Sequence, residues 1–211
     1  MSNTMKWLSR LYLTFIYLVL FAPILVMVVF SFNASKVGYT WGGFSLDWYY
    51  ELFNNEAMIK AAINSVLLAV VAATVTTVIG SLTALSFQRY NFKGKSVLQS
   101  LLFVLMMSPE IVLAISLLAL FLMIGIELGF VTLLLAHITF CLPFVVITVS
   151  ARLASLDNSI LEAARDLGAS EFTMIRTVLL PTIMPAVLAG WVLAFTLSLD
   201  DVVVSTFNTG A

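Results

Sequence analysis

Four stretches of this sequence, residues 11–35, 61–88, 128–151 and 177–199, contain no aspartate, glutamate, lysine or arginine. A fifth stretch, residues 96–126, is interrupted by a single acid, Glu110. An α-helix needs about 20 consecutive apolar residues to cross the hydrocarbon core of a bilayer. Only 10% of all residues are charged, whereas soluble domains carry about 25%. The sequence therefore predicts an all-α, polytopic membrane protein with five spans.

The uncharged runs place these spans at about residues 11–30, 64–87, 97–124, 131–150 and 183–204, in one membrane domain over residues 1–211. A cytoplasmic N-terminus puts most of the ten basic residues on the cytoplasmic side, namely Lys6, Arg10, Arg89, Lys93, Lys95, Arg152, Arg165 and Arg176. Only Lys36 and Lys60 are then outside, which agrees with the excess of positive charge on cytoplasmic loops. We expect a multi-pass protein of a bacterial inner (plasma) membrane with its N-terminus in the cytoplasm.

Two of the segments have a distinctive composition. The external segment 31–60 is rich in tryptophan and tyrosine, which favour the membrane–water interface, and a short interfacial helix starting at Ser45 or Asp47 is expected there. The second span is rich in alanine, threonine, serine and glycine. Small residues allow helix backbones to approach closely in lipid, so this span is expected to pack centrally.

Three acids lie within or at the ends of predicted spans: Glu110, Asp200 and Asp201. Charged groups in hydrocarbon are costly and indicate function by default. Pro109 precedes Glu110 and predicts a kink in the third span. For Glu110 the alternative is a protonated structural side chain, and for the aspartates it is solvation near the outer interface. A path lined only by acids suits a cation, and a linear polyamine with separated ammonium groups would match it.

Metal binding and enzymatic chemistry are not favoured. One histidine, His137, and one cysteine, Cys141, cannot build a conventional metal cluster, and His137 is interpreted as a hydrogen-bonded packing residue. No Gly-x-x-x-x-Gly-Lys-Ser/Thr phosphate loop occurs, so ATP hydrolysis would belong to a partner. No nucleophile, base and orienting acid occur at suitable spacing. We expect neither a cofactor nor a catalytic residue.

The segment 152–181 is the only long cytoplasmic loop. Ser159 and Glu162 fit a capping box that starts a helix, and Gly168 stands where a left-handed C-cap is wanted. Ser170 can cap a second helix that runs to Leu180 and stops at Pro181. That helix places Phe172, Ile175 and Leu179 on one side. Either a simple connecting hairpin or a docking element for a soluble partner fits this pattern.

The residues of this loop resemble the EAA loop of ABC-importer permeases. Glu162-Ala163-Ala164, Gly168, Val178 and Leu180-Pro181 match the family pattern at the same spacing, with Val178 in place of isoleucine. The resemblance implies the MetI-like type I ABC importer permease fold. It also implies that the loop forms the helices that contact a cytoplasmic ATPase, and the residues expected to take part are Glu162, Ala163, Ala164, Gly168, Phe172, Leu180 and Pro181.

Four further segments, residues 103–112, 137–146, 190–193 and 200–205, are similar to the spermidine/putrescine permease subunits of these importers. The resemblance implies a permease that forms the polyamine path with a second permease, and it associates the path with Glu110 and Asp200, beside Asp201. The expected partners are a dimer of ABC ATPase subunits, a second permease, a periplasmic polyamine-binding protein and the lipid bilayer, with no nucleic acid. The spermidine and putrescine preferences are not distinguished.

Two alternatives remain open at this point. The family has a sixth helix after the fifth span, whereas this sequence ends at Ala211, so the sixth is expected to be missing and the chain could be a truncated, inactive permease fragment. The other alternative is an ion-coupled secondary carrier in which Glu110 binds protons. The EAA-like loop would have no use in such a carrier.

Overall fold

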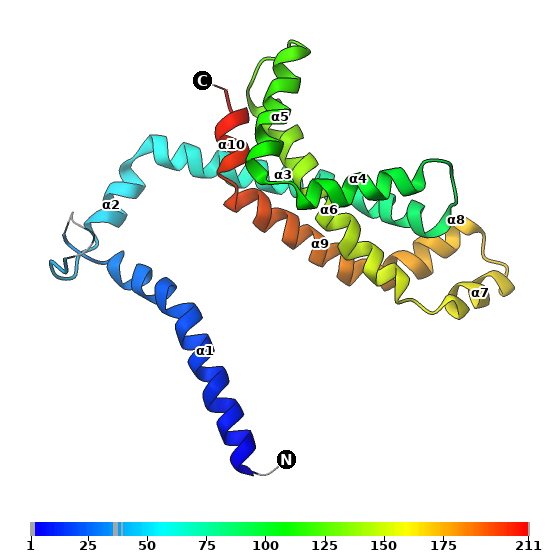
Figure 1. Ribbon diagram of the computed structural model, residues 1–211, viewed down its shortest axis with the longest axis horizontal. Coiled ribbons are helices and arrows are strands. Elements are labelled where there is room, and N and C mark those ends of the chain that lie inside the picture. The colour runs from blue at the N-terminus through cyan, green and yellow to red at the C-terminus, as the bar shows by residue number, and fades with distance from the viewer. Residues whose placement is uncertain (1–2, 36–37, 39, 211) are drawn as a thin grey trace. The chain divides into compact units, whose positions relative to one another are not determined.

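The computed structural model describes residues 3–35, 38 and 40–210, so Lys36, predicted to be external, lies outside the described residues. The chain forms two compact units, Met1–Ala62 and Ile63–Ala211. Throughout the described residues the ordered elements are helical, apart from one isolated bridge between Asn33 and Phe44. This confirms the all-α prediction (Figure 1).

The first unit contains α1 (Asn3–Phe30) and α2 (Asp47–Asn54). The loop between them is organised by Asn33, whose buried side chain accepts hydrogen bonds from the N–H groups of Ser35 and Gly42. The Ser45 hydroxyl accepts the N–H of Asp47 at 2.9 Å, and α2 begins at that residue. Of the two predicted starting positions for the short helix, the structure therefore has Asp47.

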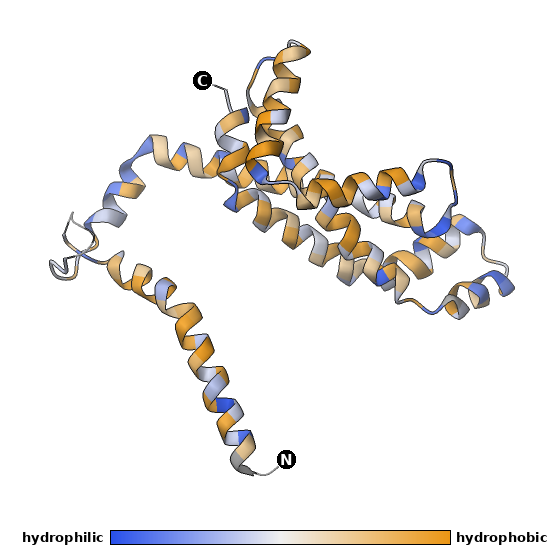
Figure 2. Cartoon of the chain, viewed as in Figure 1, coloured by the Kyte–Doolittle hydropathy of each residue, from blue (hydrophilic) through white to orange (hydrophobic). Residues whose placement is uncertain are grey.

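The second unit is built on α3 (Glu56–Arg89, which starts in the first unit), α6 (Phe130–Ala154) and α9 (Leu180–Asp200). Their residues form the main hydrophobic core. Val145 of α6 lies between two glycines: a Cβ atom at Gly80 would be 2.8 Å from Val145 Cγ1, and one at Gly190 would be 3.4 Å from it. At Gly80, α3 therefore approaches α6 closely, as its small residues predicted. Figure 2 shows apolar residues along these helices and polar ones at the turns.

Two predicted spans are interrupted. The third is split into α4 (Lys95–Met107) and α5 (Glu110–Met123), which are bent by 115° at the break. The kink predicted at Pro109 is thus a complete break between two helices, and the span over 97–124 stays a prediction. Ser108 is extended, because a proline disfavours the α-helical backbone conformation of the residue that precedes it. The helix ends there, and Pro109 precedes a new helix that starts at Glu110.

The helix expected over 183–204 is also interrupted: α9 ends at Asp200 and α10 (Val203–Asn208) follows. Asp201 is extended and its carboxylate accepts the backbone N–H groups that begin α10. α10 packs on α5 and α6 around Ala114, Phe121, Ala136 and Val204. Figure 1 shows α5 and α10 at one end of α6. At its other end lie α7 (Asn158–Asp166) and α8 (Glu171–Met174).

Candidate functional site

The two helix breaks meet at the N-terminal ends of α5 and α10. Glu110 is the first residue of α5, and Asp201 is the residue from which α10 is capped. α4 is 13 residues long, so the break before Glu110 lies about 20 Å along that helix from Lys95. A hydrocarbon core is about 30 Å thick, so a helix of this length that starts at one membrane surface would reach past the midplane. Irregular backbone at such a depth is tolerated where it is buried in protein or lines a water-filled path.

Asp201 is held by several donors and its side chain is completely buried. Its Oδ1 accepts the N–H of Val204 at 3.1 Å, and its Oδ2 accepts the N–H of Ser205 at 2.8 Å. The Ser205 hydroxyl donates to the same Oδ2 at 3.0 Å. These bonds satisfy N–H groups that the start of a helix otherwise leaves without partners. Asp201 thus organises the α9–α10 junction.

His137 of α6 stands against this junction, and its side chain is also completely buried. Its Nδ1 is 2.8 Å from the hydroxyl of Ser198, and its Nε2 is 3.1 Å from the hydroxyl of Ser205. The Nε2 atom is also 3.5 Å from Asp201 Oδ2. The sequence interpretation of His137 as a hydrogen-bonded residue holds, but its partners on α9 and α10 could not be identified from spacing.

Glu110 approaches this cluster from α5. Its partly exposed side chain is a close neighbour of Asp201, and the charge of Asp200 is also close by. Two carboxylates at such a distance repel each other unless they share a proton or hold a cation between them. No lysine or arginine occurs in residues 96–151 or 177–211 that could neutralise the group.

The three acids predicted for the path are therefore adjacent but differ in exposure. Asp200, the last residue of α9, is exposed, Glu110 is partly exposed and Asp201 is buried. Among the described residues, no group of three or more histidine, cysteine or acidic side chains could hold a metal ion. Chemically, the arrangement can hold a proton or an organic cation on the Glu110 side, with Asp201 as a fixed neighbouring charge.

The loop predicted to be cytoplasmic begins with α7, whose N-cap differs from the prediction. Asp157, not Ser159, is the cap, and its Oδ1 accepts the N–H of Ser159 at 2.9 Å. Hydrogen bonds from the backbone and side chain of Ser159 hold the pKa of the Asp157 carboxyl below its ordinary value. Aspartate is a strong N-cap residue and comes earlier in the chain, so the helix starts earlier. The capping-box interpretation of Glu162 was wrong, since Glu162 lies too far along α7; it is exposed.

The turn between α7 and α8 is formed as expected. Gly168 has φ +78°, the left-handed conformation that favours glycine. Its N–H donates to Arg165 O at 2.8 Å, and the N–H of Ala169 donates to Ala164 O at 3.1 Å. This pair of bonds is a Schellman motif. The Ser170 hydroxyl then accepts the N–H of Thr173 at 3.2 Å and caps α8.

The second loop helix does not stop at Pro181, contrary to the prediction. A π-helical turn, η1 (Ile175–Leu179), follows α8 and leads directly into α9. Here the N–H of Leu180 donates to Ile175 O, five residues earlier. This wider turn shifts the hydrogen-bond register just before Pro181, which then stands in the first turn of α9, where a missing N–H costs little.

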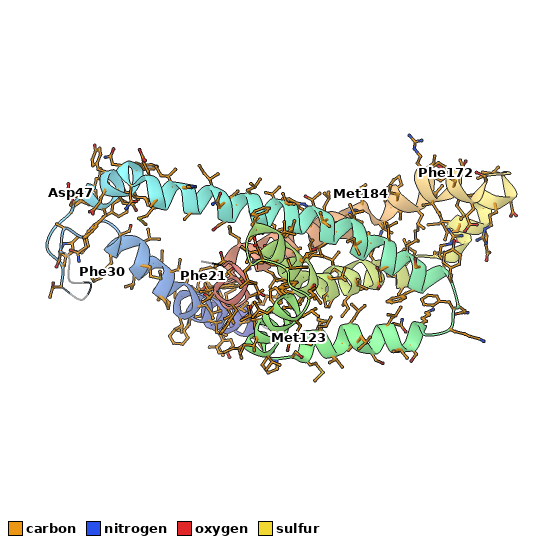
Figure 3. All side chains as sticks on the ribbon, turned by 90° about the horizontal axis from the view of Figure 1, so that it is seen from above. Phe21, Phe30, Asp47, Met123, Phe172 and Met184 are labelled. Atoms are coloured by element: carbon orange, nitrogen blue, oxygen red, sulfur yellow. The ribbon has the colours of Figure 1, made fainter. Side chains whose placement is uncertain are left out.

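The predicted apolar side of this helix is divided by the same turn. Leu179 is buried and Ile175 packs against the main core. Phe172, however, is 72% exposed and lies at the α7–α8 end of this unit (Figure 3). Leu167, in the turn, is 89% exposed. Ala164 is buried, whereas Ala163, Gly168, Leu180 and Pro181 are exposed.

The loop is attached to the transmembrane helices by an ion pair that spacing did not predict. Arg89 Nη2, at the end of α3, is 3.1 Å from Glu171 Oε1, at the start of α8. Its only sequence signal is that both residues end or begin a helix near a predicted cytoplasmic turn. The pair places the turn after α3 and the α7–α8 loop on the same side of the protein.

Comparison with known proteins gives a consistent family. The family described as "Binding-protein-dependent transport system inner membrane component" matches residues 76–210, a range that contains every residue of the acidic cluster and the loop. The chain is 57% identical over 199 residues to the spermidine/putrescine transport system permease protein PotC of Escherichia coli K12, covering 94% of this chain and 75% of that protein.

Two further relatives agree with this result. The PotC protein of Haemophilus influenzae is 52% identical over 204 residues, which cover 97% of this chain and 79% of the relative. The putrescine transport system permease protein PotI of Escherichia coli K12 is 40% identical over 198 residues, which cover 90% of this chain and 70% of the relative.

Proposed function

The chain belongs to the family of inner membrane components of binding-protein-dependent transport systems, and we propose that with a second permease it forms the path by which polyamines enter the cytoplasm. It is a transport subunit and not an enzyme. Its relatives are named as permease proteins of spermidine/putrescine and putrescine transport systems. These names support polyamines as the substrate class.

The observation that carries this proposal is that Glu110 and Asp201 are close neighbours where two broken helices meet. Glu110 is partly exposed while Asp201 is buried, so a substrate would reach Glu110 first. The exposed Asp200 adds negative charge on the same junction. A protonated polyamine carries ammonium groups separated by methylenes, and it would find acids here without any competing lysine or arginine in the adjoining sequence.

The α7–α8 loop is proposed to bind the cytoplasmic ATPase subunits. Phe172 and Leu167 supply exposed apolar surface, and Gly168 sets the angle between the two short helices. Glu162 and Ala163 are exposed on α7, with Ala164 packed beneath them, while Leu180 and Pro181 connect the loop to α9. A dimer of ATPase subunits, a second permease and a periplasmic binding protein complete the proposed transporter.

The proposed orientation places the N-terminus and the α7–α8 loop in the cytoplasm. The basic residues Arg89, Lys93 and Lys95 flank the turn between α3 and α4, and Arg89 pairs with Glu171 of the loop. The ion pair supports a common side for these two turns. Positive charge concentrates on cytoplasmic loops, so the common side would be the cytoplasm.

The test is uptake of radiolabelled spermidine and putrescine into proteoliposomes that contain the complete transporter. Glu110→Gln keeps the shape of the side chain but removes its charge, so the KM for polyamine should rise about tenfold or more, as expected for loss of an interaction with a charged group. Glu127→Gln, at an exposed position after α5, is the matched control and should behave as wild type. Unchanged uptake kinetics in Glu110→Gln would remove this residue from the path.

A further inference from the structure

α6 is a continuous helix where it passes the break between α4 and α5 and the break between α9 and α10. His137 is on this continuous helix, and its two ring nitrogens reach Ser198 in the last turn of α9 and Ser205 in the first turns of α10. A rigid imidazole therefore spans the α9–α10 break. The Nδ1–Ser198 and Nε2–Ser205 distances of 2.8 and 3.1 Å are both within hydrogen-bonding range.

The direction of these hydrogen bonds follows from the proton count. A serine hydroxyl carries one proton, and Ser205 donates its proton to Asp201 Oδ2 at 3.0 Å. The Ser205 oxygen can then only accept from His137, which places a proton on Nε2. In the neutral ring Nδ1 is an acceptor, and it receives the proton of Ser198. The chain of donors thus runs from Ser198 through His137 and Ser205 to the carboxylate of Asp201.

The two halves of this chain of hydrogen bonds have different roles. The Nε2 half ends on Asp201, whose side chain lies next to Glu110. The Nδ1 half ends on Ser198 and steadies the ring against α9. The network is buried, since the side chains of His137 and Asp201 have no exposed surface. A hydrogen bond is stronger in such surroundings, and an unpaired group there costs more.

We propose that His137 is a positioning residue for cation binding, and that through Ser205 it holds the Asp201 carboxylate in place beside Glu110. This inference deepens the proposed function and rests on it. Glu110 meets the ammonium group of the substrate, and His137 determines where the second negative charge stands. His137 itself does not touch the substrate, because its side chain has no exposed surface.

Two substitutions at the same position separate this role from simple packing. In His137→Gln the terminal amide reaches the place of Nε2 and can still donate to Ser205. In His137→Asn the shorter amide reaches only the place of Nδ1, so it can bond Ser198 but not Ser205. The two side chains are both polar and smaller than histidine, so each creates a cavity of a similar kind.

The experiment measures KM and maximal rate of spermidine uptake by the complete transporter in proteoliposomes, normalised to assembled complex. His137→Asn should raise KM about tenfold at a nearly unchanged maximal rate, and His137→Gln should raise it less than about threefold. Thr139→Val is the control on the same helix, because the Thr139 hydroxyl donates to Leu135 O of that helix, and this variant should keep the wild-type KM.

A double variant tests whether histidine and serine act as one unit. Ser205→Ala should raise KM as His137→Asn does, and the combination should be no worse than Ser205→Ala alone. Equal KM values for His137→Asn and His137→Gln would overturn the proposal. A KM in the double variant that is raised by the product of the two single effects would also overturn it. A raised KM in Glu110→Gln with a normal KM in His137→Asn would overturn this inference alone. A normal KM in Glu110→Gln would overturn the proposed path as well.

Discussion

Arg89 Nη2 lies 3.1 Å from Glu171 Oε1, so the last residue of α3 and the first residue of α8 are joined by an ion pair. The Arg89 side chain is only 13% exposed, whereas that of Glu171 is 59% exposed. The pair connects a transmembrane helix directly to the loop proposed to bind the ATPase. A displacement of the loop would therefore act on α3 as well as on α9, which continues from α8 through η1.

Removing this ion pair should weaken the connection between ATP hydrolysis and transport. Arg89→Gln removes the positive charge, and the expected result is a lower ratio of polyamine imported to ATP hydrolysed, with a stability loss of about 1 kcal/mol or less because one partner is solvated. Simultaneous uptake and ATPase assays on the reconstituted transporter measure this ratio.

The exchange Arg89→Glu with Glu171→Arg is the complementary variant. It should recover part of the ratio that either single substitution loses, since the opposite charges face each other again. Lys93→Gln, in the exposed part of the same turn, is the control for a general loss of positive charge. If Lys93→Gln were as damaging as Arg89→Gln, the specific role of the pair would be refuted.

Gly168 should tolerate substitution in the order asparagine, alanine, proline. Its φ of +78° is unfavourable for alanine by about 1–2 kcal/mol, and asparagine visits this region more readily. No atom lies within 4 Å of a Cβ placed there, so the penalty comes from backbone conformation and not from a clash. Proline also removes the N–H that bonds Arg165 O. Co-purification with the ATPase subunit should fall in this order, and equal retention of all three variants would contradict the proposed role of the turn.

Phe172 should contribute to partner binding and little to the stability of this chain. It is 72% exposed, so Phe172→Ala removes little internal packing. We expect weaker binding of the ATPase subunit, by about 1 kcal/mol or more as for an aromatic residue buried at an interface, with an unchanged melting temperature in detergent. Phe103→Ala, at an exposed position on α4, is the matched control. Normal ATPase binding by Phe172→Ala would exclude Phe172 from the interface.

Gly80 should be the more sensitive of the two glycines that flank Val145. A Cβ atom there would stand 2.8 Å from Val145 Cγ1, compared with 3.4 Å for Gly190. Gly80→Ala should therefore destabilise the helix packing by about 1–3 kcal/mol, the usual cost of overpacking, and Gly190→Ala by less. Thermal unfolding in mild detergent measures both, and Val145→Ala should partly rescue Gly80→Ala. If Gly190→Ala lost more stability than Gly80→Ala, the α3–α6 crossing would not be tighter than the α9–α6 crossing.

Local sequence signals were reliable where the neighbouring residues alone decide the structure. Gly168 and Ser170 form the predicted turn and cap because both depend on bonds within a few residues. Ser159 and Pro181 were misread because a second local arrangement was favoured at each position. Asp157 competes successfully for the cap, and a π-turn, which no simple periodicity indicates, removes the conflict that Pro181 would otherwise cause.

The membrane character of the chain is determined by its sequence, because the length of an uncharged run can be compared directly with the thickness of a bilayer. The acids in the spans and the EAA-like loop are equally visible there. Only the tertiary structure decided that Glu110 and Asp201 meet, that His137 bridges α9 and α10, and that Arg89 pairs with Glu171. These contacts join residues far apart in the chain, and they depend on how broken helices pack, which no local pattern records.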